Sequence, residues 1–175
     1  MKHKYAFILF LLAFLLQTTL LNVIGVFGVT PNLLLCLVIV FSFLYDEGYQ
    51  GLVLGIVFGL LYDISAAPYV GVAAIGFFII ALLIMLVTIV INKETVFSIM
   101  LVTIGSTCLY QLLYWGIMTM LGSNYGFLYM LRWLPIHIIY NTIVTTVIYF
   151  ALAKKVIRHH KDRYYTGIIK KRYIK

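Results

Sequence analysis

The 175-residue chain is too apolar to be a water-soluble domain. Hydrophobic residues make up 64% of it and charged residues only 10%, with a mean hydropathy of +1.08. A soluble domain carries roughly 25% charged residues because its surface must be hydrated. The bilayer must therefore be the solvent for most of this chain. Since one span takes about 20 apolar residues, the length allows roughly five to seven spans and little else.

The net charge of +8 comes entirely from the end of the chain. Nine Lys or Arg and a single acid, Asp162, follow residue 153, whereas four bases and four acids cancel in the part before it. Lys and Arg next to membrane spans stay on the cytoplasmic side. The charge therefore predicts a cytoplasmic tail, and it does not indicate a nucleic-acid site.

The apolar runs predict an all-α membrane protein, with a six-helix transmembrane bundle over residues 1–153 and the basic tail over 154–175. The expected spans are 5–27, 30–46, 48–63, 69–91, 96–121 and 133–153. Bases at the N-terminus and in the tail place both ends in the cytoplasm, which requires an even number of crossings.

The second and third apolar runs are short, so a re-entrant hairpin over residues 31–62 is an alternative to two spans. Such a hairpin would place Asp46 and Glu47 near the middle of the bilayer, at a cost of about several kcal/mol each. Six spans are the favoured interpretation.

Glycines recur every four residues in the third span, at Gly51, Gly55 and Gly59. In lipid, such a stripe lets two helix backbones approach closely. The favoured interpretation is packing inside the bundle, for example against the fourth span with its Gly71 and Gly76. Docking of a partner's helix is the alternative.

Asp63 ends the glycine helix, where a carboxylate opposes the helix dipole. We expect it to cap or shape the outer turn that leads to Pro68. The alternative is an ion pair with Arg132, one of the few other charges that the topology places near that side.

Two polar stripes with a spacing of four lie in the last two spans. The sixth span has His137, Asn141 and Thr145, and the fifth has Thr103, Thr107 and Gln111. Polar groups inside a membrane face the bundle interior and bond to one another. We expect these groups to hold the two helices together, and a small-molecule cavity between the helices is the alternative.

The sequence contains no catalytic, metal-binding or phosphate-binding motif, and its two cysteines, Cys36 and Cys108, lie inside apolar runs. We therefore expect no cofactor, no metal and no enzymatic activity. In the tail, bases alternate with apolar doublets, which predicts an amphipathic surface helix interrupted near Gly167. Contact with anionic lipid is the favoured role of the tail, and contact with a cytoplasmic protein is the alternative.

Several short motifs occur in a characteristic order along the chain. They are Gln17-Thr18-Thr19, then Gly28-x-x-Pro31-Asn32-Leu33, then Gly59-Leu60-Leu61-Tyr62-Asp63, and finally Val70-Gly71. In this order, and in its length, six-span layout and basic tail, the chain resembles the bacterial rod shape-determining MreD family over nearly its whole length. The chain departs from the family at Asn32, where an acid is frequent, although Asn can still cap a helix.

The resemblance implies a small, non-catalytic subunit of the cell-elongation machinery in the bacterial cytoplasmic membrane. Such a subunit pairs with the single-span MreC and acts alongside MreB, RodA and a penicillin-binding transpeptidase in lateral peptidoglycan synthesis. The matched positions Gln17, Pro31, Gly59, Asp63 and Gly71 are then structural or partner-contact positions. The competing hypothesis is a substrate-binding subunit of an energy-coupling-factor vitamin transporter. That class carries an Ala-x-x-x-Ala face in its first helix, which is absent here.

Overall fold

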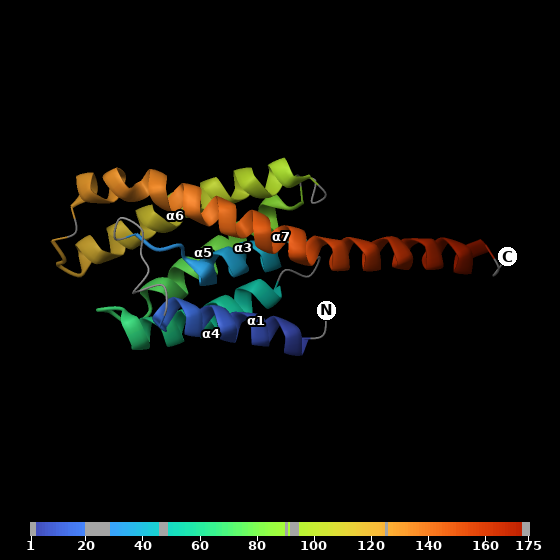
Figure 1. The fold of residues 1–175 in the computed structure, drawn as a ribbon, viewed down its shortest axis with the longest axis horizontal. Helices are drawn as coiled ribbons and strands as arrows, with labels where there is room; N and C mark the ends of the chain where they lie inside the picture. The colour runs from blue at the N-terminus through green and yellow to red at the C-terminus, as the bar shows by residue number, and fades with distance from the viewer. Residues whose placement is uncertain are drawn as a thin grey trace.

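The computed structural model is all-helical and describes residues 3–19, 29–45, 49–89, 91, 95–124 and 126–172, with side chains described between residues 4 and 153. Six α-helices follow one another in this part of the chain (Figure 1). They are α1 (His3–Thr19), α3 (Leu33–Leu44), α4 (Tyr49–Ala66), α5 (Val72–Val87), α6 (Val96–Met120) and α7 (Phe127–Arg172).

Each helix falls on one of the six predicted apolar runs, and the largest differences from the predicted bounds are at α1 and α7. α1 is described to Thr19, and residues 20–28 of the first expected span lie outside the described part. α7 begins at Phe127, earlier than the expected residue 133, and contains Pro135. The predicted loop over residues 122–132 ran too far, because the residues on which it rested, Ser123, Asn124 and Gly126, all precede Phe127. Pro135 lies inside the helix, which membrane helices tolerate.

α3 lies at the centre of the bundle. It packs against α1, α4, α5, α6 and α7, and every residue from Leu34 to Leu44 is buried. A helix that is apolar all round is one that is buried on all sides. At about 1.5 Å per residue α3 is about 18 Å long, shorter than the ~30 Å hydrocarbon core. The other helices, and not lipid alone, must therefore surround its ends.

Three helices in the described part are long and apolar enough to cross a membrane: α4, α6 and the bundle portion of α7. α1, α3 and α5 are shorter apolar helices. The start of α1 and the exit of α7 lie toward the same end of the bundle, and α3 ends and α4 begins toward that end as well (Figure 1). The turn at residues 46–48, on which the hairpin alternative depends, lies outside the described residues.

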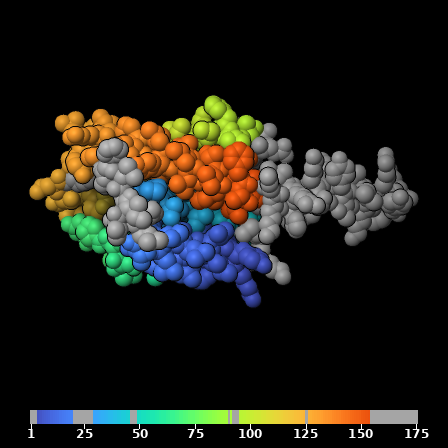
Figure 2. All heavy atoms as spheres, viewed as in Figure 1, coloured from blue at the N-terminus to red at the C-terminus, as the bar shows by residue number. Residues whose placement is uncertain are grey.

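α7 continues beyond the bundle as a single helix to Arg172 (Figure 1). The predicted interruption near Gly167 is wrong, because the helix passes through this residue without a break. One Gly inside a helix costs about 1 kcal/mol relative to Ala, which weakens a helix without ending it. Figure 2 shows the side chains of α1 and of the bundle portion of α7 over one face, with only a narrow strip of the 29–45 segment between them.

The glycine face of α4, formed by Gly51, Gly55 and Gly59, is covered by other helices of the same chain. A Cβ added at Gly51 would come within 3.0 Å of the Val38 carbonyl oxygen, and one at Gly55 within 2.8 Å of the Val38 side chain. At Gly59 it would come within 2.8 Å of the Ala74 Cα atom of α5. The three glycines thus bring α4 into close contact with α3 and α5, which agrees with packing inside the bundle.

The two glycines expected on the other side of this contact have different roles. Gly71 has a φ of 100° at the start of α5, and an added Cβ there would meet nothing within 4 Å. Gly76 faces the ring of Tyr110 in α6, where an added Cβ would come within 2.9 Å. The glycine helix therefore packs on the Ala74 region of α5 and not on Gly71 or Gly76.

Replacement of Gly59 by Ala should lower the stability of the protein. The new Cβ would press on backbone atoms of α5, and overpacking of this kind costs about 1–3 kcal/mol. Thermal unfolding in detergent should show a lower midpoint for Gly59→Ala. The matched control is Gly105→Ala in α6, where an added Cβ meets nothing within 4 Å. Equal midpoints for the two variants would contradict the close contact.

Candidate functional site

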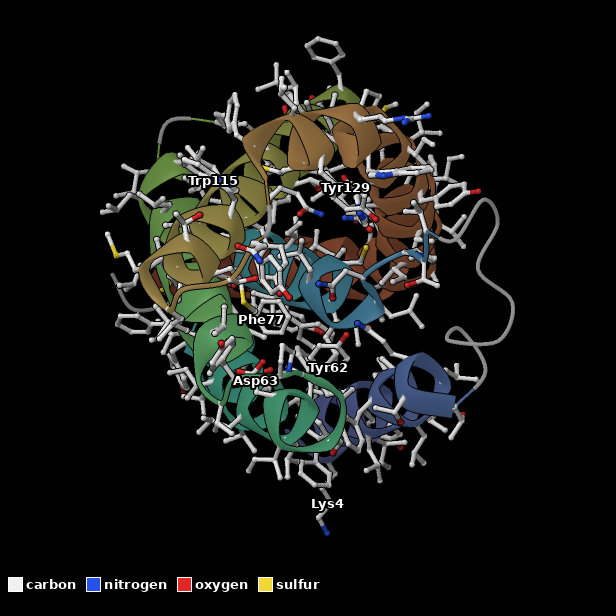
Figure 3. All side chains as sticks on the ribbon, turned by 90° about the vertical axis from the view of Figure 1, so that its left-hand side faces the viewer. Lys4, Tyr62, Asp63, Phe77, Trp115 and Tyr129 are labelled. Atoms are coloured by element: carbon white, nitrogen blue, oxygen red, sulfur yellow. The ribbon has the colours of Figure 1, made fainter. Side chains whose placement is uncertain are left out.

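Asp63 closes the corner between α4 and α5 (Figure 3). It is only 1% exposed, and its carboxylate accepts hydrogen bonds from the backbone N–H groups of Gly71 at 3.0 Å, Ala73 at 2.9 Å and Ala74 at 3.3 Å. The first N–H groups of a helix have no partner within it. Asp63 supplies that partner from a different helix, and its charge faces the positive end of the α5 dipole.

The local sequence explains why the cap must come from elsewhere. Gly71 is the residue that precedes α5, and it makes no side-chain capping bond because it has no side chain. Its positive φ of 100° is a conformation that glycine adopts without strain. Gly71 thus turns the chain into α5 and leaves the helix start open for the carboxylate of Asp63. This arrangement agrees with the predicted role of Asp63 in shaping the outer turn.

The alternative ion pair between Asp63 and Arg132 is not formed among the described residues. Arg132 is exposed on α7, with its guanidinium carbon 5.7 Å from the centroid of the Trp133 ring. The Asp63 carboxylate is instead turned inward onto backbone donors. The two charges share an end of the bundle, but the Asp63 carboxylate is stabilised by the backbone N–H groups at the start of α5.

A second polar cluster joins four helices through amide side chains. Asn141 of α7, which is 1% exposed, accepts from the Asn32 backbone N–H at 2.9 Å and donates to the Thr107 hydroxyl of α6 at 3.3 Å. Gln17 of α1 accepts from the Leu34 backbone N–H at 3.1 Å and donates to the Asn32 side chain at 3.4 Å. These bonds tie α1, α6 and α7 to the start of α3.

The cluster satisfies the first backbone donors of the central helix. Asn32 is the N-cap of α3, and its side chain accepts from the Leu35 backbone N–H at 2.9 Å. Pro31, which precedes it, has no N–H group and so adds no donor that must be satisfied. Three amide side chains, from α1, the N-cap and α7, therefore accept from three backbone N–H groups at the start of α3, those of Leu34, Leu35 and Asn32.

Aromatic rings surround these polar groups. The Tyr62 side chain lies beside Gln17, and the Tyr110 side chain lies beside Asn32. Tyr110 also stacks on Phe77 of α5, with ring centroids 5.4 Å apart. In the view along the bundle, Tyr62 and Phe77 lie toward the interior (Figure 3). The rings connect the Asp63 corner to the amide cluster.

The structure brings together only part of the polar stripe expected on α7. Asn141 meets Thr107 of α6 as predicted, and Thr145 is fully buried beside Cys36 of α3. Gln111 is 8% exposed and His137 is partly exposed, and neither side chain has a hydrogen-bond partner in the described part of the chain.

The link between α1, α3 and α7 was not predicted from the sequence. Gln17 and Pro31 entered it only through the family resemblance, and Asn32 was expected as a cap without partners in other helices. The available signal was a single amide in an otherwise apolar first helix, because such a group must find a partner inside the bundle. Its partner could not be read from spacing, since Asn32 and Asn141 are 109 residues apart.

The chemistry of the two clusters suits the fixing of helices in place. Their groups are amides, hydroxyls and one carboxylate, and most of them bind a backbone group or one another. Within the described residues, no three His, Cys, Asp or Glu side chains are grouped as metal ligands would be. What the clusters do is hold the starts of α3 and α5 against helices from both halves of the chain.

Replacement of Asp63 by Ala should destabilise the protein by about 1–3 kcal/mol, because it leaves buried N–H groups of α5 without an acceptor. Asp63→Asn, which keeps one acceptor oxygen, should lose less. The measurement is thermal unfolding in detergent, with Ser65→Ala as the control, since the Ser65 hydroxyl is exposed and bonds within α4. Rescue of Asp63→Arg by Arg132→Asp would contradict the cap and restore the ion-pair hypothesis.

Replacement of Asn141 by Leu should also destabilise the bundle, because the Asn32 N–H and the Thr107 hydroxyl both lose their partner. Interhelical hydrogen bonds in membranes contribute about 0.6 kcal/mol on average, and an orphaned buried N–H adds about 1–3 kcal/mol. Unfolding of Thr146→Val provides the comparison, because the Thr146 hydroxyl bonds only to its own helix. A loss no larger than that of the control would show that the cluster does not hold the helices.

The chain was compared with known proteins. The family model of the rod shape-determining protein MreD matches residues 2–156. Searches of curated proteins and of solved structures give no match. The family match begins at the start of α1 and runs past the end of the bundle, so it includes Gln17, Asn32, Asp63 and Asn141. The chain therefore belongs to the family of the rod shape-determining protein MreD, whose members are bacterial membrane proteins that determine cell shape.

Proposed function

We propose that this chain is a non-catalytic, multi-pass subunit of the cell-elongation machinery in the bacterial cytoplasmic membrane. In this role it binds an MreC-type single-span protein and helps to organise lateral peptidoglycan synthesis beside MreB, RodA and a penicillin-binding transpeptidase. The observation that carries the proposal is the family match over residues 2–156.

The interior of the bundle supports a scaffold. The starts of α3 and α5 are fixed by side chains from other helices, and the glycine face of α4 is in close contact with α3 and α5. Polar groups engaged in this way fix a single arrangement of the helices. A protein that positions partners needs such a fixed outer surface.

The surface open to a partner is apolar and lies elsewhere than the glycine face. Among the described helices, α1 packs only on α3 and α4, and its outer side exposes large apolar side chains. These are Tyr5, Phe7, Ile8, Leu11, Leu12, Leu15 and Leu16. Because the glycine face is already covered, we infer that a partner's transmembrane helix binds to an outer face of this kind.

The proposed topology has six spans over residues 1–153, with both termini in the cytoplasm. Two observations support it: α1 begins and α7 leaves the bundle toward the same end (Figure 1), and the bases of the sequence concentrate after residue 153. The tail would then contact anionic lipid headgroups, each base contributing about 1 kcal/mol near the surface.

Purification of the tagged chain from its own bacterial membrane tests this function. We expect an MreC-type single-span protein in the eluate, and we expect the chain to restore rod shape to cells that lack it. The control is an unrelated multi-pass protein with the same tag. Recovery of ATPase subunits in place of the MreC-type protein would contradict the proposal and favour the vitamin-transporter class.

A further inference from the structure

The turn that joins α6 to α7 is the part of the bundle farthest from the start of α1 and the exit of α7 (Figure 1). α6 ends at Met120, Gly122 turns the chain with a φ of 81°, and α7 begins at Phe127. Trp115 of α6 contacts Phe127 with ring centroids 5.1 Å apart, so the two helix ends pack together. We call this end of the two helices the outer tip. Its exposed side chains are Met120, Leu121, Phe127, Leu128, Tyr129, Leu131 and Arg132.

The outer tip extends beyond the hydrocarbon core of a bilayer. The bundle portion of α7, Phe127–Ala153, has 27 residues, which is about 40 Å at a rise of 1.5 Å per residue. A tilt of about 20° reduces its extent across the membrane only to roughly 38 Å, against ~30 Å for the core. Bases follow from Lys154 onward, and bases next to a span stay at the cytoplasmic headgroups. With that end fixed, the excess of about 8 Å falls at the outer tip.

Large apolar side chains of the outer tip are uncovered. Met120 is 89% exposed, Leu128 79% and Tyr129 58%. Within the core such exposure is ordinary, because acyl chains cover the side chains. Acyl chains do not reach the level of the tip, so these residues face headgroups and water. Apolar side chains gathered in this way outside the lipid mark an interaction site.

Arg132 adds a positive charge to the outer tip. It is exposed, with its guanidinium carbon 5.7 Å from the centroid of the Trp133 ring, and it forms no ion pair with the described part of the chain. The other charged residue near this end, Asp63, is buried and bound to the start of α5. Bases next to spans usually stay on the cytoplasmic side. One at the opposite end therefore indicates an anionic partner.

The partner must supply an anion and also cover the apolar side chains. A lipid phosphate would pair with Arg132 but would leave Leu128 and Met120 uncovered. An amphipathic protein helix can do both, because one face packs on apolar residues while a carboxylate at its edge accepts two parallel hydrogen bonds from a guanidinium. The charge and the exposed apolar residues together favour a protein helix over a headgroup.

We propose that the outer tip binds an amphipathic helix of another membrane protein, and that this helix lies along the outer surface of the membrane. Its apolar face packs on Leu128 and Met120, and an Asp or Glu at the edge of that face pairs with Arg132. The contact is separate from the outer face of α1, which does not pack on α6 or α7 among the described helices. The proposal rests on the topology given under the proposed function, which places the tip outside, and not on the identity of the partner.

The side of the membrane is tested first, with Asn124→Cys in the exposed turn between α6 and α7. Intact cells are treated with a charged maleimide that does not cross the cytoplasmic membrane. The parent chain gives the background, since its own Cys36 and Cys108 lie within α3 and α6. We expect labelling in intact cells. Labelling only after the cells are opened would overturn the topology, and this proposal with it.

Photo-crosslinking in the native bacterial membrane tests the contact itself. p-Benzoylphenylalanine replaces Leu128 in one chain and Leu112 in the control, because Leu112 is an exposed α6 residue at the depth of the acyl chains. We expect a protein adduct from position 128 that is absent from position 112. Mass spectrometry of the adduct should place the crosslinked peptide outside the partner's apolar span and find an Asp or Glu in it. An adduct with lipid alone would overturn the proposal and assign the tip to headgroups.

Reversal of the charge separates this contact from chance proximity. Arg132→Glu should lower the yield of the protein adduct about tenfold, the loss expected for one charge-assisted hydrogen bond, and Arg132→Lys should lower it less. Both variants should unfold at the temperature of the parent protein, because the side chain is exposed. Replacement of the partner's acidic residue by Lys should restore the adduct of Arg132→Glu. An undiminished adduct in Arg132→Glu, or no restoration, would overturn the proposal; with Asn124→Cys labelled from outside, the proposed function would stand.

Discussion

A helix whose sides are buried in protein depends on other helices for partners to its terminal backbone groups. α3 is such a helix, and its start takes those partners from Gln17 of α1, from its own Asn32 and from Asn141 of α7. Each bond satisfies a donor of α3 and also fixes the position of a second helix. The arrangement of the first and last helices around the centre follows from this one requirement.

The same requirement recurs at the start of α5, where a carboxylate takes the place of an amide. Gly71 supplies the turn but cannot supply a cap, and Asp63 reaches across from α4 to accept from three N–H groups. The glycines of α4 make this reach possible, because they bring its backbone close to α5. Small residues thus set the distance between helices, and polar residues set where each helix begins.

These contacts connect the fold to a role in cell shape. A bundle whose helix starts are fixed by side chains from distant parts of the chain presents a constant outer surface to the proteins around it.

The class of protein, the number and approximate place of the described helices, the glycine face and the cap at Asn32 could all be predicted from the sequence. The sequence also indicated the family, which the comparison confirms. These features are local: they depend on composition, on spacing within one helix, or on the order of short motifs. The partners of Asp63 and of the α4 glycines depend on which helices pack together, which these local features do not give. Within the described residues, Asp63 does not form the alternative pair with Arg132 but binds the start of α5, and Gly59 contacts Ala74 in place of the expected Gly71 and Gly76.

The packing of the helices was needed to show which helix is central, which helix supplies each cap, and which polar residues of α6 and α7 meet. The physical reason is that a membrane helix can be apolar on its lipid face as well as on its packed face, so periodicity does not show which neighbour it meets. The bond between Asn32 and Asn141 spans 109 residues. In the sequence, neither Asn32 nor Asn141 differs from any other amide residue in or near a span. The packing of α3 between α1 and α7 brings the two together.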